Sequence, residues 1–318
     1  ASAPAGVSLA TVRDGMEFTL PDDAPALVAL NTAFLEDGLC VEIEGELAEP
    51  LQVLFLGTDG KACHPRNVYH IKRNGRAEVL ETYVSLGEGE HWTNSVGVAV
   101  VAENAEFHLT RLQLENESAF HTSNLLVDQA RDSRATSNVV TLGCRLVRNE
   151  IVSAQNGEGC VTTLNGLFLT RGEQHVDNHT LIEHRLPHCE SHELYKGILD
   201  DKSSGVFRGK IHVFEDAQKT DAKQSSANLL LSDTAVVDAK PQLEIYADDV
   251  RCTHGATIGQ LDEQALFYLR ARGIARDDAR NLLIHAFASD ITARVGVPAV
   301  RDRIEELLEA RLPGGEED

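Results

Sequence analysis

The chain contains 318 residues, of which 50 are acidic and 29 are basic, so its formal charge is −21. This length allows one large domain or two ordinary ones. The acidic balance argues against nucleic acids, whose binding requires a cationic surface, and against anionic membrane surfaces. The sequence also has no run of 18 apolar residues, and its first residues lack the basic-then-apolar pattern of a signal peptide. We therefore expect neither nucleic acid nor a membrane as a partner.

Between about residues 27 and 258, short strand-like runs follow one another without a convincing amphipathic helix. This pattern argues against a doubly wound α/β architecture. One central apolar residue per run recurs every 12 to 17 positions, at Leu112, Leu126, Val140, Val152, Leu167, Leu181, Ile198, Val213, Leu230 and Leu243. A loose repeat of this length fits a β-solenoid in which two half-turns form one flattened coil, with roughly eight coils in all. The 5% aromatic content suits a narrow interior of stacked Val, Leu and Ile.

The pattern changes after Gly259, where helical periodicity begins. Helices are predicted at about 261–273, 276–293 and 300–312, with Gly273 ending the first of them. The acidic residues at the C-terminus are expected to form a solvated tail. The sequence is thus divided into a β-solenoid core at 27–258 and a small α-helical domain at 259–318.

Residues 1–26 are interpreted as an N-terminal remnant or leader. The first residue is Ala1 and the only methionine is Met16, which suggests a piece of a longer chain.

Six cysteines are scattered along the chain without a C-x-x-C motif. They are Cys40, Cys63, Cys144, Cys160, Cys189 and Cys252. Because small secreted proteins cluster their cysteines, this spacing predicts reduced thiols in a cytoplasmic protein. Disulfide pairing is the less favoured alternative.

Three familiar motifs of nucleotide binding and catalysis are absent from the sequence. It has no phosphate-binding G-x-x-x-x-G-K-[ST] loop, no G-x-G-x-x-G after a strand and no G-x-S-x-G elbow. The chain is therefore not expected to bind ATP through such a loop by itself.

The densest group of metal-binding residue types lies between residues 175 and 192. Its members are His175, His179, His184, His188 and His192, with Cys189 among them. A helix would align several of these histidines, but Pro187 and the strand context oppose one. Solvent-facing or coil-stacking histidines are the preferred interpretation, and a metal site remains the alternative.

A second candidate site lies near the end of the strand-rich region, at Cys252 and His254. In an extended strand, residues two apart point to the same face, so the thiol and the imidazole project together. This pair of donors suits zinc or the iron of an iron–sulfur cluster. The alternative is a buried thiol beside a hydrogen-bonded histidine.

Several segments carry a recognisable set of motifs between residues 27 and about 292. They are 29–34 (ALNTAF), 36–38, 51–56, 184–187, 196–199, 205–210, 217–222, 228–232, 241–245, 247–257 and 267–269. These segments resemble the SufB/SufD family of iron–sulfur cluster assembly scaffolds. The closing run at 247–257 resembles the SufD members more than the SufB members.

The resemblance implies a right-handed parallel β-helix and a non-catalytic scaffold subunit. Family members assemble with an ATPase, SufC, which docks on the C-terminal helices, and a nascent cluster is thought to form where SufB and SufD meet. Here this implies Cys252 and His254 as candidate ligands of a transient cluster, with His254 the stronger candidate. The implied docking region for the ATPase runs from about residue 261 to 293, with candidate contacts at Leu266, Phe267, Tyr268, Leu269 and Gly273.

Further expectations follow from the same resemblance. ATP-driven pairing of two SufC-like subunits would move the helices and open the SufB–SufD junction. The chain would form a homodimer in isolation, because a solenoid exposes edge strands. FAD is possible as a cofactor but unsupported by the sequence. SufD members usually carry a helical N-terminal domain, whose absence here fits a truncated chain.

Two alternatives to the scaffold function remain open. Polysaccharide lyases also use parallel β-helices, but the acidic pairs at 200–201 and 248–249 give only weak support for such a carbohydrate-active protein. A purely structural interaction protein, in which Cys252 and His254 are inert, is the third possibility.

Overall fold

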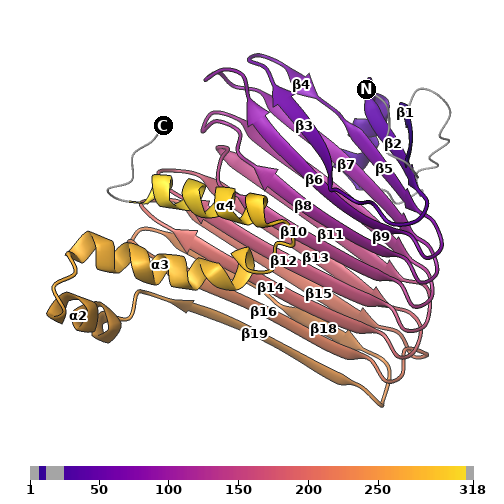
Figure 1. Cartoon of the computed structure of the whole chain (residues 1–318). Coiled ribbons are helices and arrows are strands. Elements are labelled where there is room, and N and C mark those ends of the chain that lie inside the picture. Colours follow the sequence, from indigo (N-terminus) through magenta and orange to yellow (C-terminus); the bar gives the residue numbers. More distant parts are fainter. Residues whose placement is uncertain (1–6, 12–24, 313–318) are drawn as a thin grey trace.

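The computed structural model describes residues 7–11 and 25–312. It is a parallel β-solenoid of about 8 turns followed by C-terminal helices, with 51% of residues in strands and 16% in helices (Figure 1). The mainly β solenoid predicted from the spacing of apolar residues is therefore confirmed. No helix in the described part of the chain is both long and apolar enough to cross a membrane.

The solenoid is built from two sheets, here called sheet A and sheet B. Sheet A contains, in spatial order, β1 (Val7–Thr11), β2 (Gly38–Ile43), β5 (Arg66–Ile71), β7 (Trp92–Val101), β9 (Phe120–Gln129), β11 (Leu146–Gln155), β13 (His175–His184), β15 (Ser204–Val213) and β17 (Val236–Ala239). Two short strands join it at the side, β4 (Ala62–Cys63) next to β7 and β18 (Gln242–Ile245) next to β15.

Sheet B contains β3 (Leu51–Gly57), β6 (Arg76–Ser85), β8 (Glu106–Gln113), β10 (Arg134–Thr141), β12 (Val161–Thr170), β14 (Glu190–Leu199), β16 (Asp221–Leu230) and β19 (Arg251–Gly259). All named strand pairs are parallel except β1 with β2.

Consecutive strands of the central coils alternate between the two sheets, so residues one full coil apart become neighbours. In sheet A, Val152 pairs with Leu181, and in sheet B, Val140 pairs with Leu167. In the series of apolar residues that recur every 12 to 17 positions, the two members of each pair are separated by one intermediate member. The 14-residue interval is therefore the half-turn of the solenoid, as predicted.

Alternating side chains fill the space between the sheets, and the interior differs from the expected aliphatic stack. Six of the described aromatic residues are buried, and the ring centroids of two of them, Tyr195 and Phe207, lie 4.8 Å apart inside the solenoid. Tyr195 is accommodated because Gly166 is its neighbour in the ladder, and a Cβ there would lie 2.2 Å from the ring. The interior also holds a buried ion pair between Glu81 and Arg111, 2.8 Å apart on adjacent coils.

One helix lies where the sequence predicted none. α1 (Ala26–Ala33) packs on the outer face of sheet A, where Val28 joins a cluster with Val68, Val96 and Val98. It is only eight residues long, has no side-chain cap and buries only Val28 and Asn31. The expectation of an uninterrupted series of strands is therefore wrong at this point, because so short a helix lacks a clear amphipathic pattern.

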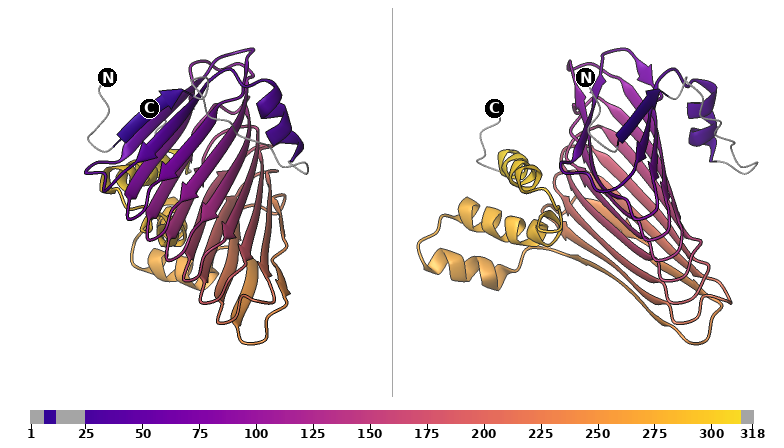
Figure 2. Two further views of the ribbon diagram at one scale, coloured as in Figure 1. Left: turned by 90° about the vertical axis from the view of Figure 1, so that its right-hand side faces the viewer. Right: turned by 45° about the vertical axis from the view of Figure 1, so that its right-hand side comes forward.

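The three helices predicted after Gly259 are present, as α2 (Glu263–Ala271), α3 (Arg276–Thr292) and α4 (Pro298–Arg311). α3 and α4 pack on the outer face of sheet B, in a cluster that includes Val140, Leu167, Ile284 and Ile304. Figure 2 shows α2 and α3 together extending away from the solenoid. α4 and the inner part of α3 therefore share a hydrophobic core with the strands.

The domain limits at residues 26 and 258 stay predictions. β1 lies within 1–26 and pairs with sheet A, and the helices after residue 259 pack on sheet B. Met16 and the acidic tail after residue 312 lie outside the described residues.

Lys196 on the outer face of β14 connects α3 to the solenoid. Its ammonium donates to Phe287 O at 2.8 Å and to Asp290 Oδ2 at 2.5 Å, and it lies 4.3 Å from the centre of the Phe287 ring. The Lys196 side chain is only 8% exposed. Sheet B and α3 are thus joined by a nearly buried charge as well as by apolar contacts.

Replacing Lys196 by Met should lower the free energy of unfolding by about 1–2 kcal/mol, because a charge-assisted hydrogen bond is lost while Asp290 stays solvated. Amide hydrogen exchange should accelerate in α3, and urea unfolding measures the stability change. The matched control is Lys210→Met, which removes a half-exposed ion pair with Glu244 and should change stability by less than about 1 kcal/mol. Equal losses in the two variants, or unchanged exchange in α3, would contradict the anchoring function of Lys196.

Candidate functional site at the open end of the solenoid

The last strand of the solenoid, β19, forms an exposed edge. It is the terminal strand of sheet B and pairs with β16 alone among the described strands (Figure 1). Eight of its nine residues are exposed and Cys252 is half-buried. Because no further coil covers it, this edge presents unpaired backbone groups and the interior-facing side chains of the final turn.

Cys252 and His254 lie on the interior-facing side of β19. Their ladder partners are Ala222 and Gln224, both buried inside the preceding coil. The two candidate residues therefore continue the interior stack but are left uncovered at the open end. Burial raises the pKa of the Cys252 thiol, so metal binding there must displace a proton.

The coil beneath His254 is polar. Gln224 Nε2 donates to Glu193 Oε2 at 2.5 Å, and both side chains are 3% exposed. Burial raises the pKa of Glu193 to about 7. A neutral or partly neutral carboxyl group thus lies two strands from His254.

The stack beneath Cys252 contains Ala222 and Ser191. Ser191 Oγ lies 2.9 Å from Nε2 of the fully buried His184, whose pKa is lowered by burial to about 4. His184 is therefore a neutral residue of the interior near this end.

The open end offers two metal donors rather than a complete coordination sphere. Within residues 7–11 and 25–312, no three His, Cys, Asp or Glu residues converge closely enough to hold a metal ion. A tetrahedral iron or zinc centre needs four ligands. A metal held by Cys252 and His254 would thus require donors from another molecule.

The five histidines singled out in the sequence do not meet. Two of the histidines, His175 and His179, are on β13. His175 Nδ1 lies 2.7 Å from Ser204 Oγ, and His179 forms an ion pair with Asp177 at 2.8 Å. The others are distributed between the interior (His184), a turn with φ of 60° (His188) and the exposed face of β14 (His192). Because alternate strand residues point to opposite sides, the short sequence spacing does not bring these side chains together.

The two acidic pairs considered for a lyase engage basic residues elsewhere. Asp200 forms an ion pair with Arg280 of α3 at 3.1 Å, and Asp249 pairs with Lys219. Asp200 and Asp249 therefore act in separate structural contacts.

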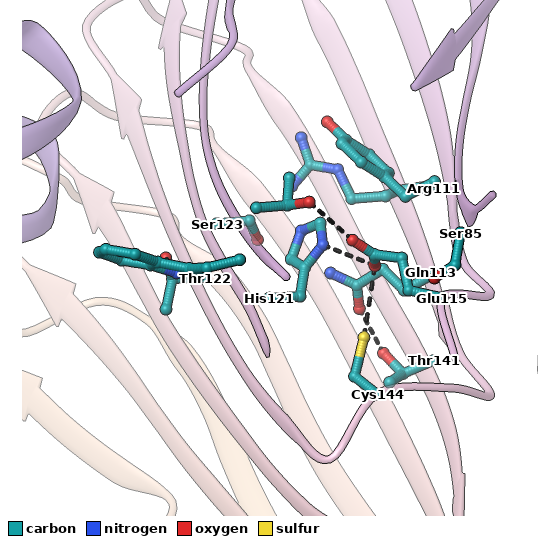
Figure 3. A network of polar contacts seen from close by, with 12 residues as sticks. Ser85, Arg111, Gln113, Glu115, His121, Thr122, Ser123, Thr141 and Cys144 are labelled. Atoms are coloured by element: carbon teal, nitrogen blue, oxygen red, sulfur yellow. Dashed lines mark hydrogen bonds and ion pairs between the residues drawn. The ribbon is translucent and has the colours of Figure 1, made fainter. Parts of the chain in front are cut away.

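A buried polar network, which the sequence did not reveal, lies where β8 and β9 meet the next coil (Figure 3). Glu115 Oε2 accepts hydrogen bonds from His121 Nδ1 at 2.8 Å and from the Cys144 thiol at 3.3 Å, and its Oε1 accepts from Thr93 at 2.8 Å. Burial alone would raise the pKa of Glu115, but the contact with His121 and these hydrogen bonds lower it. Except for His121 Nε2, which has no hydrogen-bond partner among the described residues, these groups satisfy one another, and we assign the network to coil stacking.

All six cysteines are free in the structure. Cys160 and Cys189 precede adjacent strands of sheet B, and both thiols donate to Gly157 O, at 3.2 and 3.3 Å. They are fully buried, whereas Cys252 is accessible. Cys63, which precedes His64, is partly exposed to the same degree, so among the described cysteines Cys63 and Cys252 both combine partial exposure with a nearby histidine in the sequence, and Cys252 is the one at the open end.

Two of the five predicted partner-binding residues, Phe267 and Tyr268, form a second exposed surface on α2. Phe267 and Tyr268 are 74% and 58% exposed, and the Arg272 guanidinium lies 3.7 Å from the centre of the Tyr268 ring. Leu266 is instead buried, and Gly273 has the positive φ of 88° expected of a residue that follows a helix end. Two neighbouring solvent-exposed aromatic side chains are typical of a protein interaction surface.

Glu193 yields a prediction about pH. Its folded pKa of about 7 exceeds the ordinary value of 4.5, so the native state binds a proton that the unfolded state releases between these values. Wild-type stability relative to Glu193→Gln should therefore fall as pH rises through this window, by up to about 3 kcal/mol. Urea unfolding of both proteins at several pH values measures the difference. A difference that is independent of pH would refute the raised pKa.

Comparison with known proteins identifies the family. Residues 54–287 match the family model described as SUF system FeS cluster assembly, SufBD core domain. The chain is 36% identical over 273 residues to the iron–sulfur cluster assembly protein SufD of Escherichia coli, covering 84% of this chain and 64% of that protein. It is 33% identical over 295 residues to an iron–sulfur cluster assembly SufBD family protein of Synechocystis, covering 89% and 65%. The chain thus spans slightly less than two thirds of the length of these relatives.

The family match covers most of the solenoid and continues into α3. It agrees with the resemblance carried by the sequence motifs. The observed fold is the solenoid that the spacing of apolar residues predicted. The chain therefore belongs to the SufB/SufD family of iron–sulfur cluster assembly proteins.

Proposed function

We propose that this chain is a non-catalytic scaffold subunit on which an iron–sulfur cluster is assembled at the open end of the solenoid. The observation that carries the proposal is the pair Cys252 and His254, uncovered together on the interior-facing side of an edge strand. Iron binds both thiolate and imidazole donors. In this proposal the cluster is cargo that is held transiently and passed on.

The remaining ligands come from a SufB-like partner that pairs with the edge of β19. Edge strands offer a row of backbone donors and acceptors to a second sheet, so β-augmentation would bring the partner's ligands next to Cys252 and His254. In the absence of that partner, the same edge supports a homodimer of this chain. Both assemblies use one surface and therefore exclude each other.

A SufC-like ATPase docks on α2 in this proposal, and the ATPase activity belongs to that partner. Phe267 and Tyr268 provide aromatic anchors, and α2 leads directly into α3. The contact of α3 with Lys196 on β14 offers a physical route from the docking helices to the strands. Movement of α3 on ATP binding would thus act on sheet B and on the junction with the SufB-like partner. We place this assembly in the cytoplasm, in agreement with the free thiols.

His254→Ala tests the proposed cluster site. In a complex with SufB-like and SufC-like subunits, the variant should retain about tenfold less iron and sulfide, because a direct ligand is removed. Subunit assembly should be unchanged by size-exclusion chromatography, since the SufB-like partner pairs with the backbone of β19 in this proposal. The control is His192→Ala, an exposed histidine on the outer face of sheet B. Unchanged iron and sulfide in the His254 variant would refute the assignment.

Phe267→Asp and Tyr268→Asp test the docking surface. Loss of an aromatic anchor typically costs about 2 kcal/mol or more in binding, so each variant should weaken ATPase-subunit binding about 30-fold. Isothermal titration calorimetry measures the Kd, and circular dichroism verifies the fold. Leu282→Asp, at another exposed apolar residue on α3, serves as a comparison that maps the extent of the surface. Full affinity in both α2 variants would exclude α2 as the docking helix.

A further inference from the structure

We propose that Gln224 and Glu193 are positioning residues, which hold the imidazole of His254 in one orientation and one tautomer. The inference deepens the proposed function, on which it rests: it names the groups behind the candidate iron ligand. These three residues form one row across β14, β16 and β19, from the solenoid interior to its open end.

The row follows from the strand register. Glu193 pairs with Gln224 in the β14–β16 ladder, and Gln224 pairs with His254 in the β16–β19 ladder. Neighbouring strands lie about 4.8 Å apart, so paired side chains on one face are stacked directly upon each other. All three occupy the interior-facing side of sheet B.

A hydrogen bond fixes the orientation of the Gln224 amide. Its Nε2 donates to Glu193 Oε2 at 2.5 Å, and the amide passes so close to Gly209 of sheet A that a Cβ there would lie 2.3 Å from Nε2. Because the nitrogen is committed to Glu193, the oxygen Oε1 is the end that remains available. The absence of a side chain at residue 209 provides the space for this arrangement.

The Gln224 oxygen lacks a donor. Oε1 is buried and has no hydrogen-bond partner among the described residues. A buried acceptor without a donor is unfavourable, and such groups usually mark a bond made to something else. The next side chain in the row is the exposed His254 ring, which makes no hydrogen bond to this oxygen in the structure. In our proposal the ring turns toward Oε1, and its N–H supplies the donor that this oxygen lacks.

A hydrogen bond from His254 to Gln224 would prepare the imidazole to bind a metal. An imidazole binds a metal through one ring nitrogen, and its other nitrogen normally donates to a carbonyl or carboxylate that fixes the tautomer. Gln224 supplies the carbonyl, and Glu193 prevents the amide from turning over. Since Gln224 is uncharged and Glu193 keeps an acceptor oxygen in either protonation state, the arrangement holds across neutral pH.

The first test measures the tautomer of His254 in the full chain by nitrogen NMR of ¹⁵N-histidine, with the signals identified by their loss in His254→Ala. Gln224→Met keeps the length of the side chain but removes the acceptor, and Glu193→Leu frees the amide. Each should change the ratio of the two neutral tautomers about fivefold, the worth of one hydrogen bond. Glu193→Gln, which retains an acceptor oxygen, should preserve the wild-type ratio.

The matched control is Gln155→Met. Gln155 is also a buried glutamine next to a histidine in its ladder, His184, but it lies two coils further from the end and bonds to Thr162 and Glu190 O. The Gln155→Met variant should lower the free energy of unfolding about as much as Gln224→Met does. It should leave the ratio of the His254 tautomers unchanged. A wild-type ratio in both Gln224→Met and Glu193→Leu would overturn the proposal, as would an equal change in Gln155→Met.

The second test measures binding of Fe(II) alone, under anaerobic conditions, to the complex with the SufB-like and SufC-like subunits. Gln224→Met should weaken Fe(II) binding about tenfold, a typical effect of losing the hydrogen-bond partner of a ligand, while Gln155→Met should not. Failure of the proposed function gives a different result: His254→Ala would then leave iron binding unchanged. Reduced binding in His254→Ala with full binding in Gln224→Met would refute the positioning role alone.

Discussion

The structure depends on the hydrogen-bonded ladder between successive coils. Each coil donates to and accepts from the next one, as where Glu190 N meets Cys160 O at 2.8 Å, and each side chain stacks on its equivalent one coil away. A ladder of this kind leaves an edge strand at each end, and among the described strands of sheet B these are β3 and β19. The open edge at β19 is thus a direct consequence of the architecture, and the candidate site occupies it because the interior stack ends there.

The same stacking explains why polar groups are tolerated inside. Glu81 meets Arg111 on the adjacent coil, Glu115 meets His121 within one coil, and Glu193 meets Gln224 on the adjacent coil. The first two pairs lie in closed coils, where the partners bind each other and, of their side-chain polar atoms, only His121 Nε2 is left without a hydrogen-bond partner among the described residues. The third lies next to the end, where one amide oxygen is still unpaired, so its chemistry is directed toward the edge.

The spacing of apolar residues was sufficient to predict the solenoid, because strand length and turn length are local properties that repeat along the chain. The C-terminal helices were predicted for the same reason, since their periodicity is local. α1 escaped detection because it is short and is stabilised by packing on sheet A. The five histidines around His184 show the limit of spacing as a guide, because strand alternation and turns direct them to different environments.

The sequence by itself determined the repeat, the helical C-terminal region, the family motifs and the shared face of Cys252 and His254. Each of these depends on residues that are near in sequence or on a pattern that recurs. Only the tertiary structure decided that β19 is an edge strand of sheet B, that Lys196 joins α3 to sheet B and that Glu193 and Gln224 lie in a row with His254. These contacts join residues about 30 to 94 positions apart, and their pairing depends on how many residues each turn contributes to the ladder.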